Sequence, residues 1–367
     1  MKKLIYLKFN KDLLLFFFYL VSVMSLIVWT IQAVNYFDFV TKDGHGLKVY
    51  FIYSILNFPK IIHRILPFVY FISLFYIIIS YETRDELSIF WRNGISKISF
   101  VKILLTLSIF LTLFQILLGA YISPSSQLKS RNYLKNSNMD FFVNLINEGK
   151  FINAVKDLTI FVNKKNTDGS FSQIFLDDST KNNPKMIYSK KGYIINNEKN
   201  KIFVLLDGKV INFENGKVKS FSFERTNFNL KNFETNTIIV PKIQETTSIN
   251  LLGCYLDFFL TKNTYFDCNP KLSKEIQQEL VKRFYKPIFI PVITLFCCFL
   301  LVQSKYSINY KKSKRQIFFI TFLLILFSEA ALRYTSSSSV NLYLYLLAPI
   351  AIFAFALKSF NQKVKNV

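Results

Sequence analysis

Two groups of charged residues beside or inside apolar runs are the first candidates for chemistry. Lys60 and Arg64, with His63 between them, stand where an apolar run begins. Cations there can either anchor a helix at a lipid interface or hold an anionic head group, and the sequence leaves both readings open. Glu329 and Arg333 are four residues apart inside another apolar run. That spacing favours a structural ion pair over direct contact with a substrate.

A third candidate is a short polar segment between two apolar runs. Thr83 and Glu86 have the spacing of a capping box, and Gly94 is suited to end a helix, so we expect a helix at about 83–94. Its apolar residues fall on one face at i, i+3 and i+4: Leu87, Phe90 and Trp91. Such a helix can lie in the lipid interface. It can equally fit a groove of a cytoplasmic ATPase and couple hydrolysis to transport, with Glu86 paired to a basic groove residue.

Motifs for catalysis or cofactor binding are missing from the sequence. No phosphate-binding G-x-x-x-x-G-K-[ST] occurs, and the chain has only two histidines. We therefore predict no catalytic residues, metal or cofactor, and any energy must come from a partner or an ion gradient. Cys297 and Cys298 lie in an apolar run and are expected to be buried, whereas a disulfide between Cys254 and Cys268 is left open.

Composition places the chain among membrane proteins. Hydrophobic residues make up 51% of the 367, and 41 residues are Phe. The formal charge of +23 could suggest nucleic acid. Its Lys and Arg residues, however, border apolar runs, as membrane topology requires. We therefore expect no nucleic-acid partner.

Six segments are long and apolar enough to cross a membrane as helices. They are Leu13–Phe37, Ile61–Ser80, Val101–Ile122, Pro287–Val302, Ile317–Arg333 and Val340–Leu357. Sixteen Lys and Arg residues lie in the flanks on one side of these segments, and three lie on the other. The positive-inside rule then puts both termini in the cytoplasm and the central region outside, in the periplasm of a cell with two membranes.

The central region has a different pattern. Residues 124–286 contain short alternating runs such as Leu158–Val162 and Lys201–Leu206, separated by turn signals at Asp168-Gly169, Asp207-Gly208 and Asn215-Gly216. We expect an all-β domain of the sandwich, jellyroll or barrel type with a helical exit segment. The predicted fold is thus a membrane α-helical protein with three spans in 1–123, a periplasmic jellyroll-like domain in 124–286 and three spans in 287–367.

This layout resembles the LptF/LptG family of lipopolysaccharide export permeases. The resemblance rests on three segments. They are the second span from Ile65-Leu-Pro67 to Ser80, the loop Asp85–Lys97, and Glu148-Gly-Lys-Phe151, where the β-region begins. The segment where the β-region begins resembles LptF more than LptG. Two departures are Gln32 and Asn35 at the outer end of the first span, where the family often has Lys or Arg.

The resemblance implies a transporter subunit rather than an enzyme. It implies four partners: a second LptF/LptG-type permease subunit, an LptB-type ATPase dimer, an LptC-type periplasmic bridge protein, and lipopolysaccharide as cargo. The alternative function is a membrane-anchored scaffold or sensor whose periplasmic β-domain binds a ligand. An ion-driven transporter is a third class, favoured only by the intramembrane charges.

Overall fold

A computed structural model describes most of the chain. The described residues are 2–37, 40, 46–145, 148–155, 158–166, 168–179, 184–197, 200–214, 217–229, 242–260 and 272–365. They divide into two compact units. The helical unit comprises 1–30, 57–128 and 242–367, and the second unit comprises 31–56 and 129–241.

The helices lie in two regions of the sequence, one before and one after the strands. One of the segments, η1, is a π-helix that joins α6 to α7. In chain order they are α1 (Lys2–Tyr36), α3 (Leu47–Leu56), α4 (Phe58–Thr83), α5 (Glu86–Arg92), α6 (Lys97–Leu117), η1 (Leu118–Ile122), α7 (Ser123–Leu145), α8 (Ser248–Leu260) and α9 (Ser273–Leu280). A short 3-10 turn, η3 (Ile243–Glu245), precedes α8. The C-terminal segments are η5 (Val281–Tyr285), η6 (Lys286–Ile288), α10 (Phe289–Cys298), η7 (Phe299–Leu301), α11 (Tyr310–Tyr334) and α12 (Ser339–Lys365).

Six helical segments of the described chain are long and apolar enough to span a membrane, which confirms the predicted number of spans. They are Lys2–Tyr36, Leu47–Thr83, Lys97–Leu134, Ser273–Leu301, Tyr310–Tyr334 and Ser339–Lys365. Each is longer than the apolar run that predicted it, because backbone hydrogen bonding carries the helix on through the polar flanks.

The core of the helical unit surrounds α10, the most buried of the spans. This helix contacts α4, α6, α11 and α12, and its side chains Ile293, Leu295 and Cys297 are almost fully buried. The Tyr70 hydroxyl shares a buried 2.9 Å hydrogen bond with the Thr294 hydroxyl, joining α4 to α10. By contrast, α1, α11 and α12 expose many large apolar side chains, as lipid-facing helices do.

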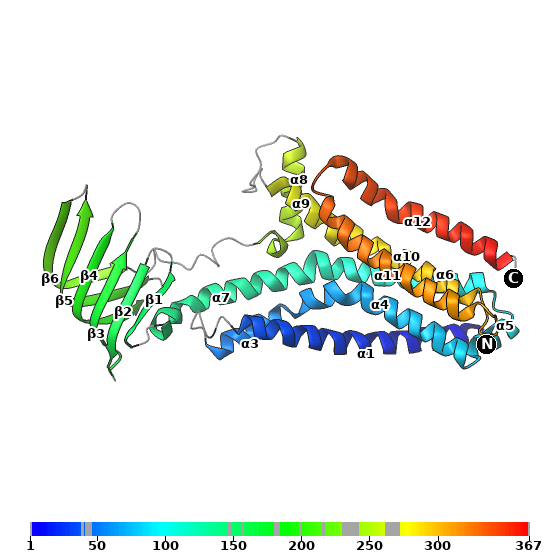
Figure 1. The fold of residues 1–367 in the computed structure, drawn as a ribbon, viewed down its shortest axis with the longest axis horizontal. Coiled ribbons are helices and arrows are strands. Elements are labelled where there is room, and N and C mark those ends of the chain that lie inside the picture. The colour runs from blue at the N-terminus through cyan, green and yellow to red at the C-terminus, as the bar shows by residue number, and fades with distance from the viewer. Residues whose placement is uncertain are drawn as a thin grey trace. The chain divides into compact units, whose positions relative to one another are not determined.

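The strands of the second unit pair in one antiparallel sheet, in the order β1 to β6 (Figure 1). Their bounds are β1 (Lys150–Val155), β2 (Leu158–Lys165), β3 (Phe171–Asp178), β4 (Lys185–Asn197), β5 (Asn200–Glu214) and β6 (Lys217–Asn229). One face carries a buried apolar cluster that includes Ile160, Ile174, Phe203 and Phe228. An antiparallel sheet inserted between two sets of helices is therefore confirmed.

The predicted turn at Asp207-Gly208 was wrong. Asp207-Gly208 is not a turn between two strands: it lies inside β5, where Asp207 has φ +50°. A Cβ atom on Gly208 would lie 2.2 Å from the Tyr188 carbonyl oxygen, so glycine allows the neighbouring strand to approach. The predicted turn at Gly169 is present, with φ +80°, and Asn215-Gly216 lies outside the described residues.

The third span also does not end at residues 122–124. The chain continues as π-helix in η1 and then as α-helix in α7. Pro124 has no N–H to donate to the carbonyl of Ala120, and that carbonyl accepts instead from the Ser248 hydroxyl. The expected β-domain thus begins with helix.

The cysteines separate into two kinds. Cys297 and Cys298 are free and buried in the core, as predicted. Cys254 is disulfide-bonded, while Cys268, the partner considered from the sequence, lies outside the described residues.

Candidate functional site

A small cationic cavity of about 100 Å³ lies at the end of the helical unit where α4 begins. Lys60 and Arg64 both line it, so the structure brings the two predicted residues together. Further cations come from Lys282 and Lys286, which precede α10 in the chain. The remaining lining is mostly polar and comprises His63, Gly119, Ser123, Pro124, Gln127, Gln244, Glu279 and Glu329.

The carboxylates of this cavity are already paired. Glu279 accepts from Lys282 at 2.8 Å, and Glu329 forms an ion pair with Lys286. Within the described chain, neither Lys60 nor Arg64 has a carboxylate within 4 Å. Neither cation thus has a direct ion pair, and Glu245 acts on Lys60 only from a longer distance, an arrangement suited to an anionic group.

The expected pair between Glu329 and Arg333 is replaced by another. Glu329 pairs with Lys286, whose side chain is 9% exposed, whereas Arg333 is exposed. A buried ammonium needs a carboxylate partner because its hydration has been lost, while an exposed guanidinium keeps its water. The intramembrane pair exists, but its cation comes from the segment before α10.

One wall of the cavity depends on a glycine. A Cβ atom on Gly119 would lie 2.5 Å from His63 Cε1, closer than any real contact allows. Gly119 lies in the π-helical segment η1, where the ring of His63 fills the space of the missing side chain. His63 Nδ1 is buried without a hydrogen-bond partner in the described structure, so a polar group entering the cavity could satisfy it.

Arg283 holds the segment that supplies Gln244 to the cavity. Its side chain is 1% exposed and donates to Glu279 Oε1 at 3.1 Å and to Ser248 Oγ at 2.9 Å. It also donates to backbone carbonyls of residues 243–246, including Gln244 at 3.0 Å. This planar donor group therefore fixes the turn η3 against α9.

Sequence reasoning missed the contribution of Lys282, Arg283 and Lys286. The available signal was three cations in five residues directly before an apolar run. It has the same form as the signal at Lys60 and Arg64, which also stand where an apolar run begins.

The predicted short helix is present as α5, which lies between the end of α4 and the beginning of α6. Gly94 is its C′ residue with φ +70°, as predicted. The predicted capping box is wrong: the Thr83 hydroxyl donates to the Ser80 carbonyl, and Asp85 is the N-cap residue with φ +61°. Asp85 makes no side-chain cap because its carboxylate is held elsewhere.

The apolar face of α5 points into the protein itself, which corrects its expected role. Leu87 is 1% exposed and Phe90 is 5% exposed. Trp91 packs edge-on against Phe100 of α6, and Phe90 lies 5.8 Å from Tyr81 of α4, measured between ring centroids. Leu87 and Phe90 are therefore packed inside this protein, whereas Trp91 is half-buried. The face that α5 exposes is formed by Ser88, Ile89 and Arg92.

Ion pairs tie this region to other segments. Glu86 accepts from Lys8 of α1 at 3.2 Å and lies 3.9 Å from Arg84. The Asp85 carboxylate accepts from Lys305, which lowers the pKa of Asp85 and raises the pKa of Lys305. The Lys305 backbone N–H donates to Glu82 Oε1 at 2.7 Å. The loops at 84–96 and 302–309 are thus fastened together.

Comparison with known proteins agrees with this architecture. Residues 9–358 match the model of the family described as lipopolysaccharide export system permease LptF/LptG. The chain is also similar to an uncharacterized protein of Rickettsia prowazekii (strain Madrid E), with 24% identity over 324 residues, which cover 85% of this chain and 82% of that protein. Because the family match extends over nearly all six spans and the inserted sheet, the chain belongs to the LptF/LptG family of lipopolysaccharide export permeases.

Proposed function

We propose that this chain is a permease subunit of an ATP-driven lipopolysaccharide exporter of the inner membrane. It pairs with a second LptF/LptG-type subunit and uses ATP hydrolysed by an LptB-type dimer. The cargo leaves through the periplasmic β-domain toward an LptC-type bridge protein. Both termini lie in the cytoplasm in this proposal, in keeping with the distribution of Lys and Arg in the flanks.

The observation that carries the proposal is the pair of free cations in the cavity. Lys60 and Arg64 lack carboxylate partners, while the neighbouring Lys282 and Lys286 are neutralised. In the proposed orientation the cavity opens near the outer surface, where the phosphates of lipopolysaccharide lie. An ammonium and a guanidinium one helical turn apart suit such phosphates, since charge-assisted contacts strengthen as water is excluded.

Charge reversal at these positions tests the cargo contact. The test is the double variant Lys60→Glu, Arg64→Glu in the reconstituted complex. Its lipopolysaccharide-stimulated ATP hydrolysis and its transport should both fall at least about tenfold, because two attractive contacts become repulsive. Assembly of the complex should be unchanged. Lys274→Glu, an exposed change on α9 outside the cavity, is the control and should transport normally. Wild-type transport by the double variant would refute the head-group contact.

The exposed face of α5 is proposed as the surface that meets the ATPase. Ile89 is 53% exposed, and Arg92 and Ser88 flank it. Glu86, with 22% of its side chain exposed, lies at the start of the helix and can exchange Lys8 for a basic groove residue. Leu87, Phe90 and Trp91 take part indirectly, because they fix α5 to α4 and α6.

Co-purification separates this proposal from the scaffold or sensor alternative. A permease solubilised in mild detergent should bring down an ATPase subunit, and ATP hydrolysis by that assembly should respond to lipopolysaccharide. A sensor would do neither.

A further inference from the structure

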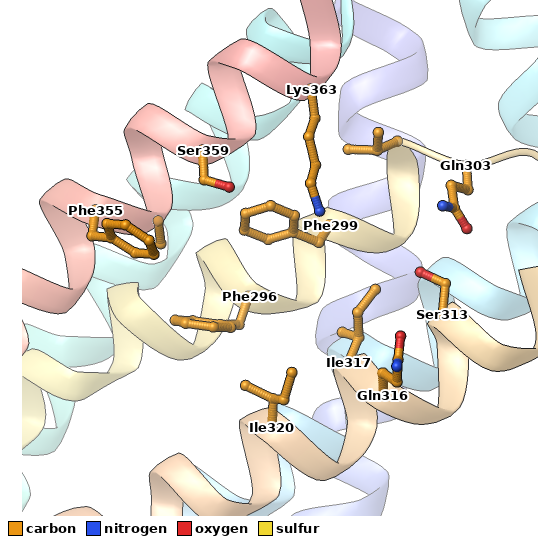
Figure 2. Close-up of a pocket in the computed structure, with 12 residues that line it drawn as sticks. Phe296, Phe299, Gln303, Ser313, Gln316, Ile317, Ile320, Phe355, Ser359 and Lys363 are labelled. Atoms are coloured by element: carbon orange, nitrogen blue, oxygen red, sulfur yellow. The ribbon is translucent and has the colours of Figure 1, made fainter. Parts of the chain in front are cut away.

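A second cavity, of about 230 Å³, lies between α10, α11 and α12 at the opposite end of these helices from the cationic cavity. Figure 2 shows Ser359 and Lys363 reaching from α12 toward Phe299, while Gln316, Ile317 and Ile320 face them from α11. The cavity is bounded by three membrane-spanning helices, so its contents come from the bilayer or from its surface.

The lining separates into an apolar part and a polar part. Phe296, Phe299 and Ile320 form an apolar wall. Toward the helix ends stand Gln303 and Lys363, whose ammonium lies 5.4 Å from the centroid of the Phe299 ring. A molecule that fits must therefore combine an apolar chain with a polar head group.

An unsatisfied polar atom indicates what is missing from this cavity. Gln303 Oε1 is buried and has no hydrogen-bond partner in the described structure. A buried acceptor without a partner costs free energy, so a donor such as a glycerol hydroxyl would be held there. The Lys363 ammonium likewise has no carboxylate within 4 Å in the described part of the chain.

The charge around the cavity selects the head group. Between Pro287 and the C-terminus the sequence contains a single acidic residue, Glu329, and that residue is paired with Lys286 in the other cavity. The segments next to this cavity hold eight cations, of which Lys305 is paired with Asp85: Lys305, Lys311, Lys312, Lys314, Arg315, Lys358, Lys363 and Lys365. Such an excess at the membrane surface attracts anionic head groups.

We propose that this cavity is a binding site for an anionic phospholipid, held as a resident lipid and not as transported cargo. Its phosphate meets Lys363, a glycerol hydroxyl donates to Gln303 Oε1, and an acyl chain lies along Phe296, Phe299 and Ile320. The lipid fastens the end of α12 to α10 and α11. A zwitterionic lipid such as phosphatidylcholine also offers a phosphate to Lys363, but its own quaternary ammonium offsets that charge. The cationic surroundings therefore favour the anionic class.

Thermal unfolding of the full chain in neutral detergent tests the site. The chain is titrated with phosphatidylglycerol, phosphatidylcholine or lipopolysaccharide, and lipids retained after purification are identified by native mass spectrometry. Phosphatidylglycerol should be retained and should raise the Tm, and phosphatidylcholine should do so much less. In Lys363→Gln the half-saturating phosphatidylglycerol concentration should rise about fivefold, the loss expected for one partly exposed charge contact.

Two further variants make the outcome decisive. Lys365→Gln removes a charge from the same helix end but outside the cavity lining, and should raise the half-saturating concentration much less than Lys363→Gln. Ser359→Leu places an apolar side chain in part of the cavity and should reduce the phosphatidylglycerol shift while the lipid-free Tm is kept or raised. Equal titrations of Lys363→Gln and Lys365→Gln, equal responses to both phospholipids, or a Lys363-dependent preference for lipopolysaccharide would each overturn the proposal.

Discussion

The ammonium of Lys305 lies 2.5 Å from Oδ2 of Asp85, and this contact joins loops that are more than two hundred residues apart in the sequence. Tyr306 adds a 3.3 Å hydrogen bond from its hydroxyl to Oδ1 of the same carboxylate. Because Asp85 is the N-cap residue of α5, the second half of the chain helps to hold the helix proposed to meet the ATPase.

Removing this contact should loosen α5 without unfolding the bundle. Asp85→Asn keeps a residue that tolerates φ +61° but loses the charge. Amide hydrogen exchange at residues 86–92 should become faster in Asp85→Asn and in Lys305→Ala. Lys311→Ala, in the same cationic loop, should exchange like the wild type. Unchanged protection of α5 in both test variants would show that its packing alone holds it.

The pH dependence of the contact follows from its two pKa shifts. The lowered pKa of Asp85 means that its contribution is present above about pH 4, the unfolded value, and is lost as pH falls through the folded value. The raised pKa of Lys305 means that its contribution is present below about pH 10 and is lost as pH rises through the folded value. The difference in Tm between wild type and Asp85→Asn should therefore stay constant from about pH 5 to 9 and shrink in stronger acid.

Charge at the exposed face of α5 should control ATPase association. Ile89→Glu and Arg92→Glu alter side chains that face solvent, so the chain should insert normally while pull-down of the ATPase is lost. Glu86→Gln should also weaken the pull-down, whereas Lys8→Gln, which removes only the internal partner of Glu86, should not. Equal effects of Glu86→Gln and Lys8→Gln would mean that the internal pair alone matters.

Arg283 should be among the least replaceable residues of the helical unit. Arg283→Met removes the donor of the Ile243, Gln244 and Thr246 carbonyls and the buried one of the two cations paired with Glu279, a loss of about 3–5 kcal/mol. Arg283→Lys cannot restore the planar set of donors and should recover little of it. Thermal unfolding in detergent measures the effect. Lys282→Gln, which removes the other, more exposed partner of Glu279, should cost about 1 kcal/mol or less.

The two faces of the sheet should differ in lipid contact if cargo passes along the β-domain. Phe203 belongs to the buried cluster on one face, while Phe161 lies on the other and is 4.7 Å from the ring of Phe151. Photo-crosslinkers at Ile194 and Val210, which border the buried cluster, should capture lipopolysaccharide during transport, and one at Phe161 should not. Adducts at Phe161 alone would reverse the assignment of faces.

The spans could be predicted because hydropathy is a local sum over about twenty residues. The cationic cavity could be predicted only in half. Lys60 and Arg64 could be recognised because they stand at the start of a predicted span. That Lys282 and Lys286 line the same cavity depends on how α4 packs against α10, which the sequence does not show. The direction of α5 could not be predicted either. An apolar stripe has the same spacing whether it covers Phe100 of its own protein or enters another one.

The contact between Gly119 and His63 sets a rule for how homologous chains can vary. With only 2.5 Å between an added Cβ and the imidazole, even alanine at position 119 would force the ring out of the cavity wall. A relative with a larger residue there should therefore have a smaller one in place of His63. The two positions should change together or not at all, since either substitution alone leaves a collision or a void in the wall of the cavity.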